Sequence, residues 1–231
     1  MVKVIDFGIG EYEEILNRQR ELFLSLVKDK KEGREGEEFI LIGEHFPVIT
    51  LGRRAQENNV LIPQNILKER GIELYKIERG GDVTYHGPGQ LIVYPILDLE
   101  KHRLGVKDYV YLLEETIIKL LQNYGIKSER VDGATGVWID KGSKKERKIC
   151  AIGIKCSRFC TMHGLALNVN PDLTGFSLIH PCGFVDKGVT SLQKETSNFA
   201  GENGMSIIKK EFLDIFLSLI FPFEEILYLS K

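Results

Sequence analysis

The sequence predicts an α/β protein of the mixed α+β kind, in which a mixed sheet is flanked by helices. Three segments place apolar residues at helical spacing, and seven shorter runs are rich in β-branched and aromatic residues and bounded by glycine, proline or charge. Several of the shorter runs follow one another with no helix between them. That order favours an antiparallel or mixed sheet over a repeated βαβ unit.

Amphipathic helices are expected at residues 12–27, 107–124 and 206–221. The first carries apolar residues such as Ile15, Leu22 and Leu26 with charged residues between them, and a charged run at residues 28–36 is expected to end it. Each helix therefore presents one apolar face, which we expect to cover a sheet.

Strands are expected at residues 39–43, 48–52, 72–77, 91–97, 136–139, 149–156 and 165–169. Residues 140–147 contain turn formers and no apolar residue, so they are interpreted as a solvated hairpin loop that leads Lys148 into the next strand. The length of 231 residues predicts one domain spanning residues 1–231, with a boundary near residues 175–180 as the alternative.

Composition argues against several classes of protein. Lys and Arg number 31 against 33 Asp and Glu, so the formal charge of -2 disfavours a general nucleic-acid binder. The first residues lack an apolar stretch of signal-peptide length, and no run of about 18 apolar residues occurs. We therefore expect a cytoplasmic protein that keeps its four cysteines reduced and has no membrane or nucleic-acid partner.

The glycine-rich stretch at residues 79–90 is a candidate binding loop. Its Gly-Gly and Gly-Pro-Gly runs allow positive φ and let a ligand approach bare amide groups, although a glycine-rich hairpin is the simpler alternative. The stretch also holds more polar groups than a turn needs, namely Arg79, Asp82, Thr84, Tyr85 and His86. It has neither a Walker lysine nor a GxGxxG pattern opening a helix, so a nucleotide loop is poorly supported.

Three of the cysteines lie close together in sequence. Cys150, Cys156 and Cys160, with His163, are residue types that bind zinc. However, no CxxC pair occurs, and Cys150 and Cys156 fall on an expected strand. Buried apolar side chains are therefore favoured over a metal site.

Cys182 differs from these three because proline and glycine flank it. An irregular backbone there favours an exposed thiol at a turn, with a structural cysteine as the alternative. A thiol becomes a nucleophile where a nearby base or cation favours the thiolate. The candidates for that group are Lys148, His86, His163 and His180. Lys148 opens an apolar strand, so its ammonium would lie at the edge of the core unless it reaches solvent.

Taken together, these segments resemble one family, the octanoyltransferases of lipoate synthesis, also called lipoyl(octanoyl) transferases. The matching stretches follow the family's order at residues 43–53, 79–99, 135–138, 147–153, 161–168, 181–183 and 190–192. They include Thr-Gly-Val-Trp at 135–138, Arg-Lys-Ile at 147–149 and Pro-Cys-Gly at 181–183. An ordered set of this length is far more specific than any single motif.

The resemblance implies a fold shared with biotin protein ligases and lipoate ligases, in which a mixed sheet and its helices surround an acyl pocket. It implies that octanoyl passes from octanoyl-acyl carrier protein to an enzyme cysteine, and then to a lysine on the lipoyl domain of a target protein. By match to the motifs, Cys182 would be the acylated nucleophile and Lys148 its activating lysine. The implied acyl-binding residues are Arg79, Gly80, Gly81, Asp82, Val83, Thr84, Tyr85, His86, Ala151, Ile152, Gly153, Gly164, Leu165 and Ala166.

Such a reaction is a thioester exchange followed by aminolysis, so neither ATP nor a cofactor or metal is expected. The main rival is an ATP-dependent lipoate or biotin ligase on the same fold, which would leave the Pro-Cys-Gly motif unexplained. A binding module that kept the fold but lost turnover is the non-enzymatic rival.

Overall fold

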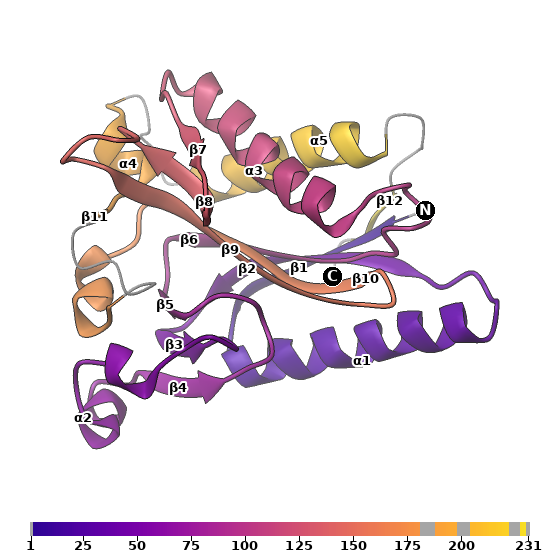
Figure 1. Cartoon of the computed structure of the whole chain (residues 1–231), viewed down its shortest axis with the longest axis horizontal. Coiled ribbons are helices and arrows are strands. Elements are labelled where there is room, and N and C mark those ends of the chain that lie inside the picture. The colour runs from indigo at the N-terminus through magenta and orange to yellow at the C-terminus, as the bar shows by residue number, and fades with distance from the viewer. Residues whose placement is uncertain (1, 181–187, 198–203, 222–226, 230–231) are drawn as a thin grey trace.

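Two β-sheets form the centre of the computed structural model, which describes residues 2–180, 188–197, 204–221 and 227–229 (Figure 1). The strands of the larger sheet are β1 (Val2–Gly10), β2 (Glu38–His45), β6 (Gln90–Ile96), β7 (Glu129–Val131), β8 (Ala134–Ile139), β9 (Arg147–Ser157), β10 (Cys160–Asn168), β11 (Gly188–Val189) and β12 (Leu227–Leu229). The smaller sheet contains β3 (Val48–Leu51), β4 (Glu73–Lys76) and β5 (Val83–His86). The helices are α1 (Tyr12–Lys31), α2 (Gln64–Glu69), α3 (Val106–Asn123), α4 (Leu192–Glu195) and α5 (Gly204–Ile220), with 3-10 turns η1 (Glu57–Asn59) and η2 (Leu173–Leu178).

The expected mixed sheet is confirmed. Its order in the described residues is β12-β1-β2-β6-β10-β9-β8-β7. The short strand β11 pairs with the first two residues of β9, Arg147 and Lys148. β1 lies parallel to β2, whereas β2, β6, β10, β9, β8 and β7 pair antiparallel in turn. The loop at residues 140–147 does join β8 to β9 as a hairpin, so the expectation that it leads Lys148 into a strand is also confirmed.

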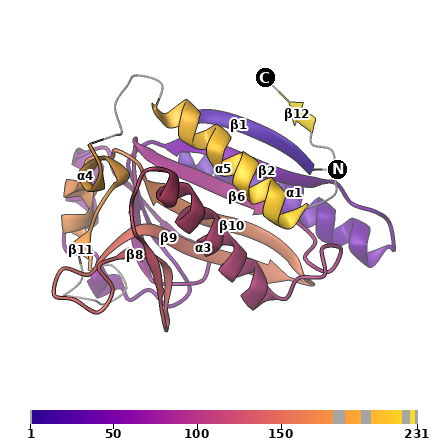
Figure 2. The ribbon, with the colours of Figure 1, turned by 90° about the horizontal axis from the view of Figure 1, so that it is seen from above.

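Helices cover both faces of the large sheet. α1 lies under one face, and α3 and α5 lie side by side across the other (Figures 1 and 2). The α1 face buries Leu16 and Phe23 against Ile92 of β6, and the opposite face buries Leu120 and Phe212 in a second apolar core. The three expected amphipathic helices are therefore confirmed.

The first helix is longer than expected. It continues to Lys31, so the charged run that was predicted to end it forms its last turn instead. Lys28, Lys30 and Lys31 lie in that turn, where the partial negative charge of the helix C-terminus favours cations. Strand β1 was not predicted, because its alternation is broken by a register shift at Gly8, a residue with φ of 64°.

The smaller sheet encloses a third apolar core. β3 pairs parallel with β4 and antiparallel with β5, and Ile49, Leu67 and Tyr85 are buried between this sheet and its flanking turns. Of the helices in the described ranges, none has both the length and the apolar character needed to cross a lipid bilayer.

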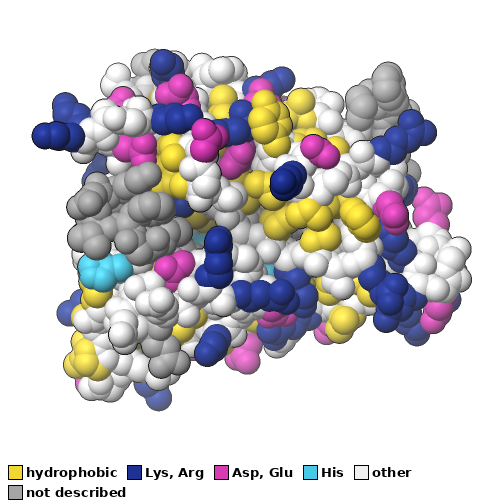
Figure 3. Space-filling view, in the orientation of Figure 1, with side chains coloured by type: hydrophobic (Ala, Val, Ile, Leu, Met, Phe, Trp, Pro, Cys, Tyr) yellow, Lys and Arg dark blue, Asp and Glu magenta, His cyan; other side chains and the backbone are white. Residues whose placement is uncertain are grey.

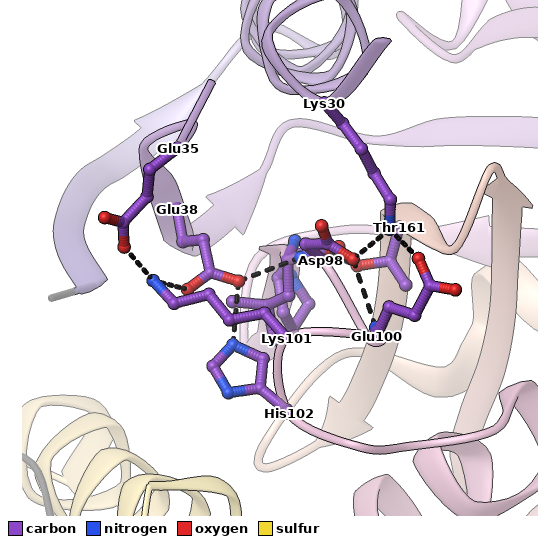
Figure 4. Close-up of polar contacts among 10 residues, drawn as sticks. Lys30, Glu35, Glu38, Asp98, Glu100, Lys101, His102 and Thr161 are labelled. Atoms are coloured by element: carbon purple, nitrogen blue, oxygen red, sulfur yellow. Dashed lines mark hydrogen bonds and ion pairs between the residues drawn. The ribbon is translucent and has the colours of Figure 1, made fainter. Parts of the chain in front are cut away.

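A polar cluster fastens the far end of α1 to the large sheet (Figure 4). The Glu38 side chain is 1% exposed, and its carboxylate accepts hydrogen bonds from the Asp98 backbone N–H at 2.8 Å and from His102 Nε2 at 2.7 Å. Lys101 Nζ lies 3.5 Å from the same carboxylate, and Lys30 of α1 pairs with Asp98. A buried carboxylate with these partners joins β2 to the loop that follows β6, because leaving them unpaired is costly.

We expect Glu38→Gln to lower the free energy of unfolding by about 2 kcal/mol, since it removes a buried charge that holds several donors. Urea denaturation at neutral pH measures this change. Glu35→Gln is the matched control, because Glu35 also pairs with Lys101, at 2.9 Å, but is 79% exposed. The Glu38 carboxylate would not stabilise the junction of β2 with the loop after β6 if both variants unfolded at the same urea concentration as the parent protein.

Candidate functional site

A pocket of about 470 Å³ lies between the smaller sheet and strands β9 and β10 of the larger one. This volume falls in the usual range of small-molecule sites. One end is lined by Ala134, Thr135, Trp138 and Lys148, and the pocket extends along β9 to Ile154. Ile154 lies six positions along the strand from Lys148, so the pocket follows the sheet for roughly 20 Å.

The glycine-rich loop crosses directly over β9. The Gly80 N–H donates to the Ile154 carbonyl at 2.8 Å, and a Cβ placed on Gly153 would lie only 2.8 Å from the Gly80 carbonyl oxygen. Arg79 is 8% exposed and donates from its guanidinium to the Thr50 hydroxyl, at 2.9 Å from Nη2, and to the Thr50 carbonyl at 2.7 Å. Glycine at these positions therefore lets two backbones meet and form one wall of the pocket.

The structure brings most of the sequence-predicted residues together. The pocket is lined by Arg79, Gly80, Gly81, Asp82, Val83, Thr84, His86, Lys148, Ala151, Ile152, Gly153, Gly164, Leu165 and Ala166. Tyr85 is not among the lining residues, because its ring packs edge-on against Phe176 in the core of the smaller sheet. Alternation along β5 turns Tyr85 away from the site while Thr84 and His86 line it.

His86 belongs to a buried chain of hydrogen bonds. Gln90 Nε2 donates to Asn168 Oδ1 at 2.9 Å, so Gln90 Oε1 is left to accept from His86 Nδ1 at 3.2 Å. Asn168 in turn donates to the Thr190 carbonyl at 2.9 Å. Burial, together with the nearby His45 and Arg79, lowers the pKa of His86 to about 3, so the ring is neutral.

Two further histidines surround the same region in neutral form. Burial lowers the pKa of His45 to about 4, and its Nε2 lies 2.9 Å from the Tyr94 hydroxyl. Burial also lowers the pKa of His163 to about 3. His163 has φ of 59° on β10, an uncommon value for a residue other than glycine, and its ring lies edge-on to Tyr94.

Lys148 occupies the opposite end of the pocket, at the start of β9. Its Nζ donates to the Thr135 carbonyl at 3.2 Å and lies 4.6 Å from the centre of the Trp138 ring. The Lys148 carbonyl accepts from the Thr190 N–H at 3.0 Å, which links it to the hydrogen-bond chain from His86. From the sequence, Trp138 was identified only as part of a motif, and Gln90 and Asn168 were assigned no role. A tryptophan in the strand that pairs with a strand-opening lysine was a usable signal.

The three clustered cysteines do not converge. Cys150 is buried on the α3 and α5 face of the large sheet, and Cys160 is buried on the α1 face. Burial raises the pKa of the Cys150 thiol and raises that of Cys160 to about 11, as expected of buried apolar side chains. Within the described ranges, no group of three or more His, Cys, Asp or Glu side chains is arranged to hold a metal ion. Cys182 lies outside the described residues.

Comparison with protein families gives a match over most of the chain. The model for the lipoyl protein ligase A/B catalytic domain matches residues 11–213. The chain is 54% identical over 190 residues to an octanoyltransferase from Bacteroides fragilis, covering 82% of this chain and 86% of that protein. It is 53% identical over 192 residues to an octanoyltransferase from Bacteroides thetaiotaomicron, covering 83% of this chain and 85% of that protein.

A solved structure shares the fold at low sequence identity. A putative lipoate protein ligase from T. acidophilum with bound lipoic acid superimposes with a TM-score of 0.62 and 13% identity, covering 94% of this chain and 84% of that one. This likeness confirms the expected ligase-like fold.

We expect Gly153→Ala to weaken binding of octanoic acid about ten-fold, since the new methyl group would push the backbone of the glycine-rich loop off β9. Isothermal titration calorimetry measures the affinity. Gly125→Ala is the control, because Gly125 has φ of 72° but no atom within 4 Å of an added Cβ. That variant should lose stability and keep its affinity. Unchanged affinity in Gly153→Ala would show that the loop does not form the binding wall.

Proposed function

The chain belongs to the lipoyl protein ligase A/B catalytic family and is an octanoyltransferase, and we propose that octanoyl-acyl carrier protein is its donor and a lipoyl domain its acceptor. Cys182 carries the octanoyl group between them as a thioester, and Lys148 activates the thiol. The observation that carries this proposal is the position of Lys148, at one end of a pocket that runs along β9 beneath the glycine-rich loop.

The proposed reaction has two steps. In the first, the Cys182 thiolate attacks the donor thioester carbonyl, the bond from that carbonyl to the carrier's sulfur breaks, and the carrier thiolate leaves. Lys148 has taken the proton of the Cys182 thiol and returns a proton to the leaving thiolate. In the second, the neutral amine of the acceptor lysine attacks the enzyme thioester and forms an amide, which releases Cys182 and one proton. A thioester supplies the activation that a ligase obtains from ATP.

The pocket suits an apolar chain of this length. Ala151, Gly153 and Ala166 line it with small side chains, which leaves room for a ligand against the sheet. Burying six methylenes at about 0.8 kcal/mol each contributes roughly 5 kcal/mol to binding. This arrangement and the family motifs support acyl-binding roles for the glycine-rich loop and for residues 151–153 and 164–166.

We expect intact-mass measurement to show one octanoyl adduct after mixing with octanoyl-acyl carrier protein without ATP or magnesium. Cys182→Ala should abolish the adduct, because it removes the proposed nucleophile. Cys150→Ser, Cys156→Ser and Cys160→Ser should each keep most of it, since these thiols are buried or half-buried and burial favours the protonated thiol.

Two different results would contradict the proposed nucleophile and the proposed donor. An adduct retained in Cys182→Ala would remove that residue from the mechanism. If octanoate with ATP were the better donor in transfer to a lipoyl domain, the chain would work as a ligase.

We also propose that the β8–β9 loop helps to dock the donor. Lys141, Lys144 and Lys145 are exposed there and form no ion pair among the described residues, and Figure 3 shows Lys and Arg side chains projecting at the upper left, over this loop. Arg147, which adds to the basic character of this loop in the sequence, forms ion pairs with Asp140 and Glu195. Acyl carrier proteins are acidic, so three free lysines near the pocket end at Lys148 would attract them.

Changing both Lys144 and Lys145 to Glu should slow transfer from octanoyl-acyl carrier protein roughly ten-fold at low salt and weaken its salt dependence. Stopped-flow measurement over a range of ionic strength tests this. The reaction of a small octanoyl thioester, which has no protein surface to dock, should be unchanged. An equal loss with both donors would show that the loop acts on the site itself.

A further inference from the structure

Trp138 and Lys148 occupy directly opposite positions in the β8–β9 pair. The register is regular up to Trp138 opposite Lys148 and then shifts, so that Val137 pairs with Cys150 and Ile149 is the extra residue. Side chains of directly opposed residues in an antiparallel pair lie on the same face, which brings the ammonium over the indole. The bulge therefore sets the position of Lys148 relative to the residues that follow it.

The indole ring is itself held in place. Trp138 is 2% exposed, and its Nε1–H donates to the Ala134 carbonyl at 2.8 Å. Gly136 lies between these two residues with φ of 126°, and a Cβ there would lie 2.5 Å from the Cys150 carbonyl oxygen and 3.5 Å from Lys148 Cε. The absence of a side chain at Gly136 lets the stem of Lys148 pass close to β8.

We propose that Trp138 is a positioning residue that holds Lys148 in its charged form at the pocket end, with the ammonium fixed between the indole face and the Thr135 carbonyl. Both partners favour the charged amine over the neutral one, since the ring face and the carbonyl oxygen carry partial negative charge. The proposal rests on the proposed function, because it assigns the proton of the Cys182–Lys148 pair to the lysine before the acyl donor arrives.

Among the described residues, the ionisable groups on the elements packed beside Lys148 have other partners or are buried in neutral form. Glu114 of α3 faces this region, but its carboxylate accepts from the Gly136 N–H at 3.0 Å and from Arg130 Nε at 3.1 Å. Cys150 on β9 is fully buried, and burial keeps its thiol protonated. Across β11, Val189 is the residue paired with Lys148.

The first test uses the fact that Trp138 is the single tryptophan of the chain. Its fluorescence at pH 7, excited where tyrosine does not absorb, reports a cation on the ring. Lys148→Met, which removes the charge, should change the emission intensity, whereas Lys148→Arg, which keeps a cation, should stay near the parent value. Identical emission in the Met variant and the parent would overturn the contact, whatever the chemistry at Cys182.

The second test measures the effect on the thiol. The rate of Cys182 alkylation by iodoacetamide, followed on its peptide by mass spectrometry, should fall about five-fold to ten-fold at pH 7 in Trp138→Leu. The midpoint of its pH profile should rise by roughly half to one unit. Trp138→Phe, which keeps an aromatic face, should restore most of the rate. Phe212→Leu controls for the loss of a buried ring away from the site.

Equal losses in Trp138→Phe and Trp138→Leu, or a loss of similar size in Phe212→Leu, would overturn the positioning role, because packing alone would then explain the effect. A protein in which Cys182 takes no octanoyl group from the carrier overturns the proposed function. The emission comparison still decides in that case whether Trp138 holds Lys148.

Discussion

The close approach of two backbones at Gly80 and Gly153 is the constraint on which the rest of the site depends. The smaller sheet is carried on a loop that meets β9 with no side chain between them, and one hydrogen bond from Gly80 to Ile154 joins the two. A methyl group at Gly153 would fill that space. Because the loop is held so close, Arg79 can turn back to Thr50 and the polar residues of β5 face the large sheet. The shape of the pocket therefore depends on glycine at positions 80 and 153 as well as on the side chains that line it.

A continuous set of buried polar contacts connects strand β5 of the smaller sheet to the lysine end of the pocket. It passes from His86 through Gln90 and Asn168 to the backbone of Thr190, whose N–H reaches the Lys148 carbonyl. Each member uses a group that would be costly to leave unpaired in the interior. The small sheet, the centre of the large sheet and the first residues of β9 are therefore held in one arrangement, which fixes Lys148 relative to the glycine-rich loop.

The fold was largely predictable because its helices and most of its strands have strong periodic patterns. Leu16, Phe23 and Leu120 recur at helical spacing and are buried as expected. Strand β1 was missed because Gly8 and Gly10 interrupt its pattern, and β5 because it is only four residues long inside a glycine-rich stretch. The motifs located the pocket, but the direction of a single side chain depends on register. That is why Tyr85 was placed in the site and Trp138 was given no role, and no local pattern predicts the positive φ of His163.

The histidines of the pocket lie away from Lys148, and burial keeps them neutral at physiological pH. His45, His86 and His163 bind protons only near pH 3 to 4, because burial disfavours their charged forms. His86 and His163 line the cavity, and His45 contacts the lining residue Tyr94. Over the pH range in which cells live, this half of the cavity keeps a constant charge. An apolar chain lying there meets the same surroundings at pH 5 and at pH 8. In the proposed mechanism, proton transfer takes place at the lysine end of the cavity, so acidity would change the rate of that step without changing the charge of the histidines that surround the acyl chain.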